Sequence, residues 1–261
     1  MQLEQEEPSA ASVKAAESDL VAGRTADGDS LFAHLLNEEP SRRRYGKAGP
    51  EVDLPSVLDD PVEMTRQAYE RGAHLYAATG LKPGTMEREM LLFAGYLPPG
   101  ARVLDVGCGP GRDLVEMKAM GFEVTGVDNS KELLAMVPEG IDTVNADFRS
   151  IPLPDASCEG VWACASLMHL PRPEMPKALA EVRRLLRVGG HFLISIKEGV
   201  GEAMVADKGM EGRFFTYYTS EELDGLLGEA GFGIEYSETK GVSGGASGLA
   251  WLTRIAVARQ A

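Results

Sequence analysis

Cysteine, basic residues and long apolar runs are all scarce in this chain of 261 residues. None of its three cysteines forms a C-x-x-C pair, which argues against a disulfide scaffold and a structural zinc site. Lys and Arg number 26 against 40 Asp and Glu, which gives a net charge of −14. Because nucleic-acid binding depends on bases that neutralise phosphates, this charge disfavours a nucleic-acid partner. No apolar run approaches the ~20 residues that span a bilayer, so we expect no membrane partner.

Residues 1–60 differ in composition from the rest of the chain, with 13 acids, six bases and few aromatic residues. Such a segment buries too little apolar surface to offset its ordering entropy, so we expect a largely flexible extension. Its apolar patch, residues 30–36, is interpreted as a transient helix, with docking on the main domain as the alternative. Its basic cluster, residues 42–44, is interpreted as a solvated arm. The acidic start lacks the apolar core of a secretory signal, which favours a cytoplasmic location.

The remainder alternates between strand-like and helix-like patterns, which predicts an α/β fold with a mainly parallel sheet covered by helices on both faces. Helical patterns over 62–78 and 84–96 come first. The predicted strands are 102–106, 122–127, 141–145, 158–165, 190–197, 232–238 and 250–257. The predicted helices among them are 111–120, 130–137, 174–187 and 220–230. We therefore divide the chain into the extension 1–60, a helical region 61–99 and an α/β domain 100–261.

A glycine-rich turn follows the first predicted strand. Asp105 ends the apolar run, and Gly107, Gly109 and Gly111 then alternate with other residues. Glycines at this spacing let the backbone turn sharply and let a ligand lie against N–H groups at a helix start. The dinucleotide-binding pattern needs a glycine where this chain has Arg112, so a nicotinamide cofactor is disfavoured.

Acidic residues also follow the next two predicted strands. Asp128 ends the second strand, where a carboxylate can accept both hydroxyls of a ribose. Asp147 follows the third strand, where a carboxylate can accept from an adenine amino group while Phe148 supplies an apolar face. The carboxyl ends of parallel strands meet at one edge of a sheet, which is where ligands bind in open α/β folds. The three acids therefore predict one nucleoside-binding crevice.

In order and spacing, these motifs resemble those of class I methyltransferases that use S-adenosylmethionine (SAM), over residues 84–238. The resemblance implies a Rossmann-like, doubly wound sheet of seven strands, the last antiparallel, with an N-terminal helical lid over the site. It also implies SAM as the methyl donor and no metal. The cofactor-binding residues that it implies are Asp105, Gly107, Cys108, Gly109, Gly111, Asp128, Asn129, Asp147, Phe148 and Met168.

The resemblance places the methyl acceptor beside the segment after the fourth predicted strand. His169 is the candidate general base there, because its ordinary pKa lies near neutral pH. The alternative is a histidine that bonds to the loop or shapes the SAM pocket. Further along, residues 199–202 are expected to form a flexible loop, and residues 213–218 resemble the Arg-Phe-Phe segment of a bacterial subgroup. The residues expected to contact the acceptor are Tyr69, Tyr76, Lys197, Arg213, Tyr217 and Tyr218.

Three functions remain open at this point. The first is a SAM-dependent methyltransferase, monomeric or homodimeric, that acts on an oxygen or nitrogen of a small molecule. The second is a peptide or protein methyltransferase whose acidic extension assists in capturing the partner. The third is a SAM-binding module without catalysis, which the intact acids and the many candidate residues on the acceptor side disfavour.

Overall fold

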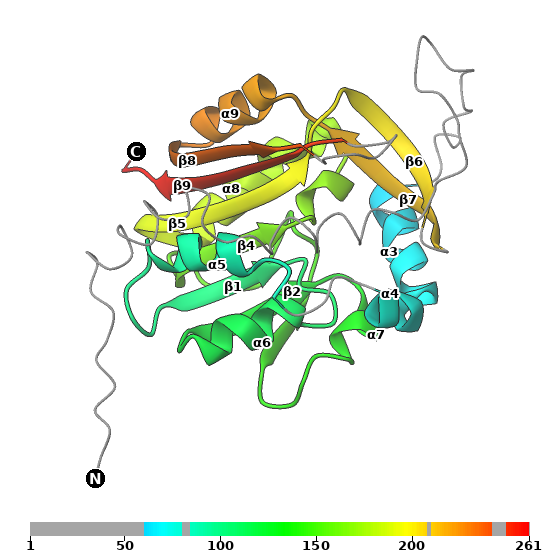
Figure 1. The fold of residues 1–261 in the computed structure, drawn as a ribbon, viewed down its shortest axis with the longest axis horizontal. Helices are drawn as coiled ribbons and strands as arrows, with labels where there is room; N and C mark the ends of the chain where they lie inside the picture. Colours follow the sequence, from blue (N-terminus) through cyan, green and yellow to red (C-terminus); the bar gives the residue numbers. More distant parts are fainter. Residues whose placement is uncertain (1–59, 80–83, 208–209, 242–248, 261) are drawn as a thin grey trace.

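The computed structural model describes residues 60–79, 84–207, 210–241 and 249–260, and its fold is drawn in Figure 1. The predicted extension, with its apolar patch and its basic cluster, lies outside the described residues. A seven-stranded sheet forms the centre of the molecule. Its strands are β1 (Arg102–Val106), β2 (Glu123–Asp128), β3 (Asp142–Asn145), β4 (Cys158–Cys164), β5 (Leu186–Lys197), β8 (Phe232–Lys240) and β9 (Trp251–Ala258).

The strand order is β3-β2-β1-β4-β5-β9-β8, and the first five of these strands run parallel. β9 runs antiparallel to both β5 and β8. The predicted Rossmann-like sheet of seven strands with an antiparallel last strand is therefore confirmed. From β1 the chain winds outward to β2 and β3, and then returns to β4 on the other side of β1. This reversal opens a crevice beyond the carboxyl ends of β1 and β4.

Helices cover both faces of the sheet (Figure 1). They are α5 (Glu87–Ala94), α6 (Arg112–Ala119), α7 (Lys131–Leu134), α8 (Met175–Leu185) and α9 (Ser220–Glu229). Because side chains alternate along a strand, neighbouring residues of β4 enter two different cores. Val161 packs with Leu179 and Val182 of α8, whereas Trp162 packs with Phe93 of α5 and Leu114 of α6.

The predicted helix over 62–78 is two helices, α3 (Pro61–Arg71) and α4 (Ala73–Thr79). The side chain of Asp60 caps α3 by accepting from the Val62 N–H at 3.0 Å. Gly72 separates the helices, which fits its low helix propensity. The helix predicted over 130–137 is also shorter, because only α7 is helical there.

Two further strands, β6 (Gly201–Asp207) and β7 (Met210–Tyr217), form a separate antiparallel pair. The expected flexible loop over 199–202 is therefore wrong at its second half, because Gly201 and Glu202 pair with β7. Helix α3 packs against β7, and the Phe214 N–H donates to Thr65 Oγ1 at 2.9 Å. In Figure 1 this pair stands with α3 and α4 at one side of the central sheet. The 3₁₀ turn η1 (Leu167–His169), which follows β4, also contacts β7.

Candidate functional site

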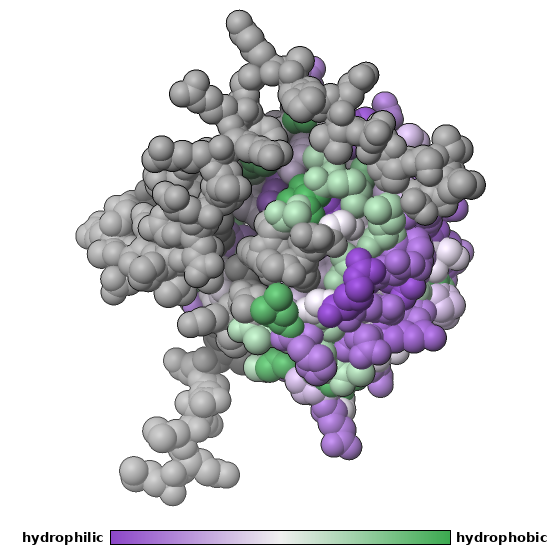
Figure 2. All heavy atoms as spheres, turned by 90° about the vertical axis from the view of Figure 1, so that its right-hand side faces the viewer, coloured by the Kyte–Doolittle hydropathy of each residue, from purple (hydrophilic) through white to green (hydrophobic). Residues whose placement is uncertain are grey.

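A cavity lies where the carboxyl ends of β1, β2 and β4 meet α3, α4 and η1. The space inside, with open solvent at the mouth counted, is about 540 Å³. Its lining residues are Val62, Thr65, Tyr69, Tyr76, Gly107, Gly109, Asp128, Asn129, Leu133, Phe148, Cys164, Ala165, Ser166, His169 and Leu170. Figure 2 shows the side of the molecule that carries α3 and the β6–β7 pair: apolar residues gather near the middle of this face, and hydrophilic residues cover its lower right part.

The glycine-rich turn forms the floor of this cavity. Gly107, Gly109 and Gly111 all have left-handed backbone angles, with φ of +86°, +54° and +85°. A Cβ added to Gly107 would lie 2.2 Å from the Cβ of Ser166, so only glycine fits there. Gly107 and Gly109 line the cavity, whereas Gly111 is the N-cap of helix α6. The side chain of Cys108 is buried and does not line the cavity.

Asp128 sits at the end of β2 and faces the same cavity. Its two carboxylate oxygens accept from the N–H groups of Gly109 at 2.9 Å and Ser130 at 2.8 Å. Burial raises the pKa of Asp128, and these backbone donors oppose that rise. The carboxylate thus ties the glycine-rich turn to the tip of β2, in the position predicted for ribose recognition. Asn129 follows it on the cavity wall.

Asp105 lies deeper and is not among the residues that line the cavity. Burial raises its pKa well above the ordinary value, and the negative charge of nearby Asp113 adds to the rise. Asp113 itself accepts from the Arg112 side chain and, at 2.9 Å, from Trp162 Nε1. Sequence reasoning missed this buried cluster, although adjacent opposite charges at a helix start right after the glycine turn are a usable signal.

Two neighbouring residues of the loop after β3, Asp147 and Phe148, have different surroundings. Phe148 lines the cavity, as predicted, but the carboxylate of Asp147 accepts from Arg149 Nε at 2.8 Å and Nη2 at 2.6 Å. Burial favours a higher pKa for Asp147, but the hydrogen bonds from Arg149 outweigh it, so the pKa is lowered. Met168 packs in the core and does not line the cavity. The adenine role of Asp147 and the cofactor contact of Met168 therefore stay predictions.

His169 is buried at the side of the cavity that is predicted to face the acceptor, between β7 and α3. Its Nδ1 lies 2.7 Å from the carbonyl oxygen of Phe214, and its Nε2 lies 3.0 Å from the hydroxyl of Tyr69. A carbonyl only accepts, so Nδ1 carries the hydrogen and Nε2 accepts from Tyr69. Burial lowers the pKa of His169 to about 4, against the opposing bond to Phe214. The imidazole is therefore neutral at pH 7, and its basic nitrogen already receives a hydrogen bond.

Two tyrosines from the N-terminal helices complete this wall. The rings of Tyr69 and Tyr76 meet edge to face, with centroids 5.1 Å apart. Arg213 of β7 donates to the Tyr69 hydroxyl at 3.3 Å. Burial raises the pKa of both phenols, so they remain protonated at neutral pH. Val62 and Thr65, which sequence reasoning missed, line the cavity from the same helix; their spacing of seven and four residues before Tyr69 is a helical signal that predicts a shared face.

The other residues predicted to contact the acceptor are not on the cavity wall. Lys197 Nζ lies 4.7 Å from the ring centroid of Phe215, and Tyr217 stacks on the same ring at 6.3 Å. Tyr218 is fully buried, with the Arg172 guanidinium 4.5 Å from its ring centroid. The structure thus brings Tyr69 and Tyr76 to the cavity and groups Lys197 and Tyr217 around Phe215.

Helix α5, which belongs to the predicted helical region 61–99, is placed elsewhere. Its residues Met90 and Phe93 are buried against the sheet in the core that contains Trp162. Of the helices in this region, α3 and α4 are the ones that wall the cavity. Within the described ranges, no three His, Cys, Asp or Glu side chains are grouped to hold a metal ion. In the same ranges, no helix has both the length and the hydropathy needed to cross a membrane.

Known proteins are similar to this chain in sequence and in fold. Residues 104–194 match the family model described as "Methyltransferase domain". Over 113 residues the chain is 34% identical to 27-O-demethylrifamycin SV methyltransferase of Amycolatopsis mediterranei, which covers 39% of this chain and 41% of that protein. Over 179 residues it is 34% identical to dimethylglycine N-methyltransferase of Parasynechococcus marenigrum, and this match covers 64% of this chain and 58% of that protein. The chain thus spans about half the length of these relatives.

Among solved structures, the chain resembles 1,6-didemethyltoxoflavin-N1-methyltransferase of Burkholderia thailandensis, crystallised with 1,6-didemethyltoxoflavin and S-adenosylhomocysteine. The two are 26% identical with a TM-score of 0.64, and the match covers 80% of this chain and 94% of that one. The glycine-rich turn, the acid at the tip of β2 and the order of the seven strands agree with these relationships. Residues 104–194 thus form a methyltransferase domain, and the chain has the fold of the class I SAM-dependent methyltransferases.

Proposed function

We propose that this protein transfers a methyl group from SAM to an oxygen or nitrogen of a small-molecule acceptor. The observation that carries the proposal is the shared cavity. The glycine-rich turn and Asp128 line one side of it, and Tyr69 and His169 line the other. A donor and an acceptor held in such a cavity meet in one orientation, which is the main contribution that a protein makes to methyl transfer.

The residues of the cavity floor fit SAM. Gly107 and Gly109 contribute only backbone to the cavity wall, so a ligand can lie directly against their peptide groups. Asp128 is buried at the cavity wall, where its carboxylate can accept from ribose hydroxyls, and Phe148 offers an apolar surface to the adenine. When bound, SAM supplies a sulfonium-activated methyl group, and the chain supplies binding, alignment and exclusion of water.

On the acceptor side, we assign His169 first to orienting the Tyr69 hydroxyl. The bond that Nδ1 donates to the Phe214 carbonyl fixes the tautomer, and Nε2 then fixes where the phenol hydrogen points. The pKa of His169, about 4, lies well below neutral pH, so this imidazole is a weak base and removes protons poorly. Any proton that leaves the acceptor toward this pair enters at Tyr69 Oη, as the phenol hydrogen passes to Nε2. The geometry supports alignment as the larger contribution.

The walls of the cavity favour a small acceptor over a peptide. Helices α3 and α4 place Tyr69 and Tyr76 across from the glycine-rich turn, and Tyr76 Cε1 would touch a Cβ at Gly109 at 3.5 Å. The names of the relatives also describe methylation of small molecules, such as demethylrifamycin and dimethylglycine.

Incubation with methyl-labelled SAM and a size-fractionated cell extract tests this function. We expect label in the low-molecular-weight fraction and calorimetric binding of SAM to the chain alone. Label confined to the protein fraction would favour the peptide or protein alternative. Binding of SAM without any transfer would indicate a non-catalytic module.

A further inference from the structure

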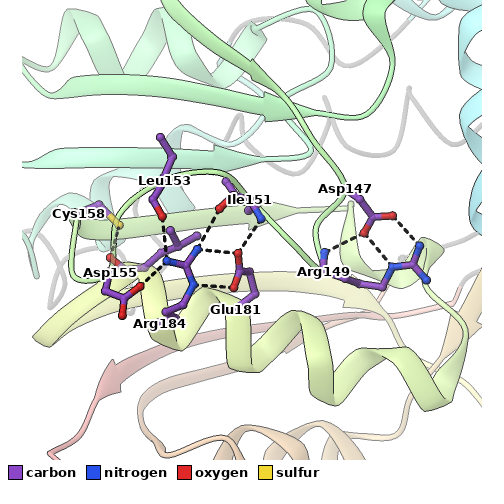
Figure 3. A network of polar contacts seen from close by, with 9 residues as sticks. Asp147, Arg149, Ile151, Leu153, Asp155, Cys158, Glu181 and Arg184 are labelled. Carbon is purple, nitrogen blue, oxygen red and sulfur yellow. Dashed lines mark hydrogen bonds and ion pairs between the residues drawn. The ribbon is translucent and has the colours of Figure 1, made fainter.

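Helix α8 holds the loop between β3 and β4 (residues 146–157) through the side chains of Glu181 and Arg184 (Figure 3). Glu181 Oε1 accepts from the Ile151 N–H at 2.6 Å. Arg184 Nη2 donates to the Ile151 carbonyl at 2.9 Å, and Nη1 donates to the Leu153 carbonyl at 2.8 Å. These hydrogen bonds are made to backbone groups of the loop. They therefore fix the path of its main chain relative to α8.

The two side chains also hold each other. Arg184 Nε and Nη2 donate to the two Glu181 oxygens at 2.8 and 2.7 Å, and the hydrogen bonds from Arg184 lower the pKa of Glu181. Exposed ion pairs contribute little, but a planar guanidinium fork fixes the direction of every bond it makes. The Ala156 N–H donates to the carbonyl of Arg184 at 2.9 Å, although Ala156 has a left-handed φ of +51°. The contacts with α8 therefore hold the loop in a strained conformation.

A second set of hydrogen bonds attaches the start of the loop to the residues before α8. Arg149 bonds Asp147 and also donates to Glu174, just before α8, at 3.0 Å. Phe148 lies between this attachment and the contacts at Ile151, and it is the loop's contribution to the cavity wall. Its position over Gly107 therefore depends on how α8 holds both sides of it.

We propose that Arg184 and Glu181 are positioning residues for the adenosyl half of SAM. Neither lines the cavity, so they act through the loop that carries Phe148 and Asp147. Small displacements of a binding wall weaken affinity disproportionately, because site residues depend on the hydrogen bonds behind them for their position. The inference rests on the proposed function, since it concerns the affinity for that cofactor.

Calorimetry on Arg184→Lys tests the proposal, with Arg183→Lys as the matched control. Arg183 occupies the neighbouring position of α8 and bonds the carbonyl of Arg259 in place of the loop. The probes are S-adenosylhomocysteine and S-inosylhomocysteine, which differ in the base alone. We expect Arg184→Lys to bind S-adenosylhomocysteine about tenfold more weakly, comparable to the loss of one good hydrogen bond, and to discriminate less between the two probes. Arg183→Lys keeps both properties.

Discrimination between the probes separates positioning from simple destabilisation, because a less stable but correctly shaped site keeps the same ratio of affinities. Glu181→Gln retains an oxygen acceptor for the Ile151 N–H, so we expect it to preserve more affinity than Arg184→Lys. The wild-type chain is measured first, and failure to bind S-adenosylhomocysteine would overturn both this inference and the proposed function. Wild-type binding with equal affinities and equal discrimination in Arg184→Lys and Arg183→Lys would overturn this inference alone.

Discussion

The two sides of the cavity are built in different ways. The side that we assign to the cofactor comes from one stretch of chain, in which the turn after β1, the tip of β2 and the loop after β3 are neighbours in both sequence and sheet. The side that we assign to the acceptor joins distant segments: 100 residues separate Tyr69 from His169, and 149 separate Thr65 from Phe214. The first side depends on backbone geometry and the second on a few side-chain bonds. Substitutions on the first side should therefore have large effects, and substitutions on the second side should have smaller effects that depend on which bond is removed.

The most severe change predicted is Gly107→Val on the cofactor side. The new side chain would collide with Ser166 in a backbone conformation that β-branched residues avoid, so we expect loss of SAM binding and a large drop in melting temperature. Gly121→Val is the matched control, because its φ is +91° but nothing lies within 4 Å of its added Cβ. Thermal unfolding and calorimetry check both. Equal effects in the two variants would show that strain alone, and not the packing of the turn, determines the outcome.

On the acceptor side, the largest predicted effect is a pH dependence. The pKa of His169 is about 4 in the folded chain, below its ordinary value of 6.5, because the ring is buried. The unfolded chain thus takes up the proton first, so stability falls as the pH drops from 6.5 to about 4. The loss reaches about 3 kcal/mol from this group. His169→Gln should remove that part of the dependence, measured by urea unfolding at pH 7 and pH 4.5. An equal loss of unfolding free energy between pH 7 and pH 4.5 in the two proteins would contradict a neutral, buried imidazole.

Asp128→Ala should weaken SAM binding by about 1.5–3 kcal/mol, or roughly tenfold or more, if its carboxylate holds the ribose. The same substitution removes the acceptor for the Gly109 N–H, so part of the loss reflects the turn itself. Asp128→Asn narrows the comparison, because it keeps an oxygen for the Gly109 N–H but loses the charge and the acceptor for the Ser130 N–H. Calorimetry that shows wild-type affinity in both variants would remove Asp128 from the cofactor site.

The same contrast explains what the sequence predicts and what it does not. Gly107, Asp128 and Phe148 could be placed because parallel strands bring their carboxyl ends together, whatever else the chain does. The bond between Tyr69 and His169 could not, since no local pattern specifies which helix meets η1. In β7 the alternation of side chains was decisive: Arg213, Phe215 and Tyr217 share one face and pack on one another, so Tyr217 is used in packing.

Some differences arise from weak local signals. Gly199 and Gly201 favour a loop, and only the pairing with β7 makes a strand of the residues that follow. Gly72, in contrast, was a visible reason to divide the first helix. Asp147 occupied the predicted strand tip, but the nearby Arg149 competes for its carboxylate, and the spacing of acids alone contains no information about such a competitor.

The smallest predicted effect is that of Tyr69→Phe on the acceptor side. The change removes the hydroxyl that donates to His169 Nε2 and accepts from Arg213, but it keeps the ring that packs against Tyr76. The neutral bond to His169 contributes about 1 kcal/mol, and the longer bond from the Arg213 guanidinium adds to it. Stability should therefore fall modestly, and SAM affinity should not change. If the Tyr69 hydroxyl orients the acceptor, the apparent Michaelis constant for the acceptor rises while that for SAM stays constant. Tyr76→Phe is the control for altering a phenol on the same wall. A loss of SAM affinity in Tyr69→Phe, with unchanged acceptor kinetics, would place this hydroxyl on the cofactor side and remove the division between the two walls.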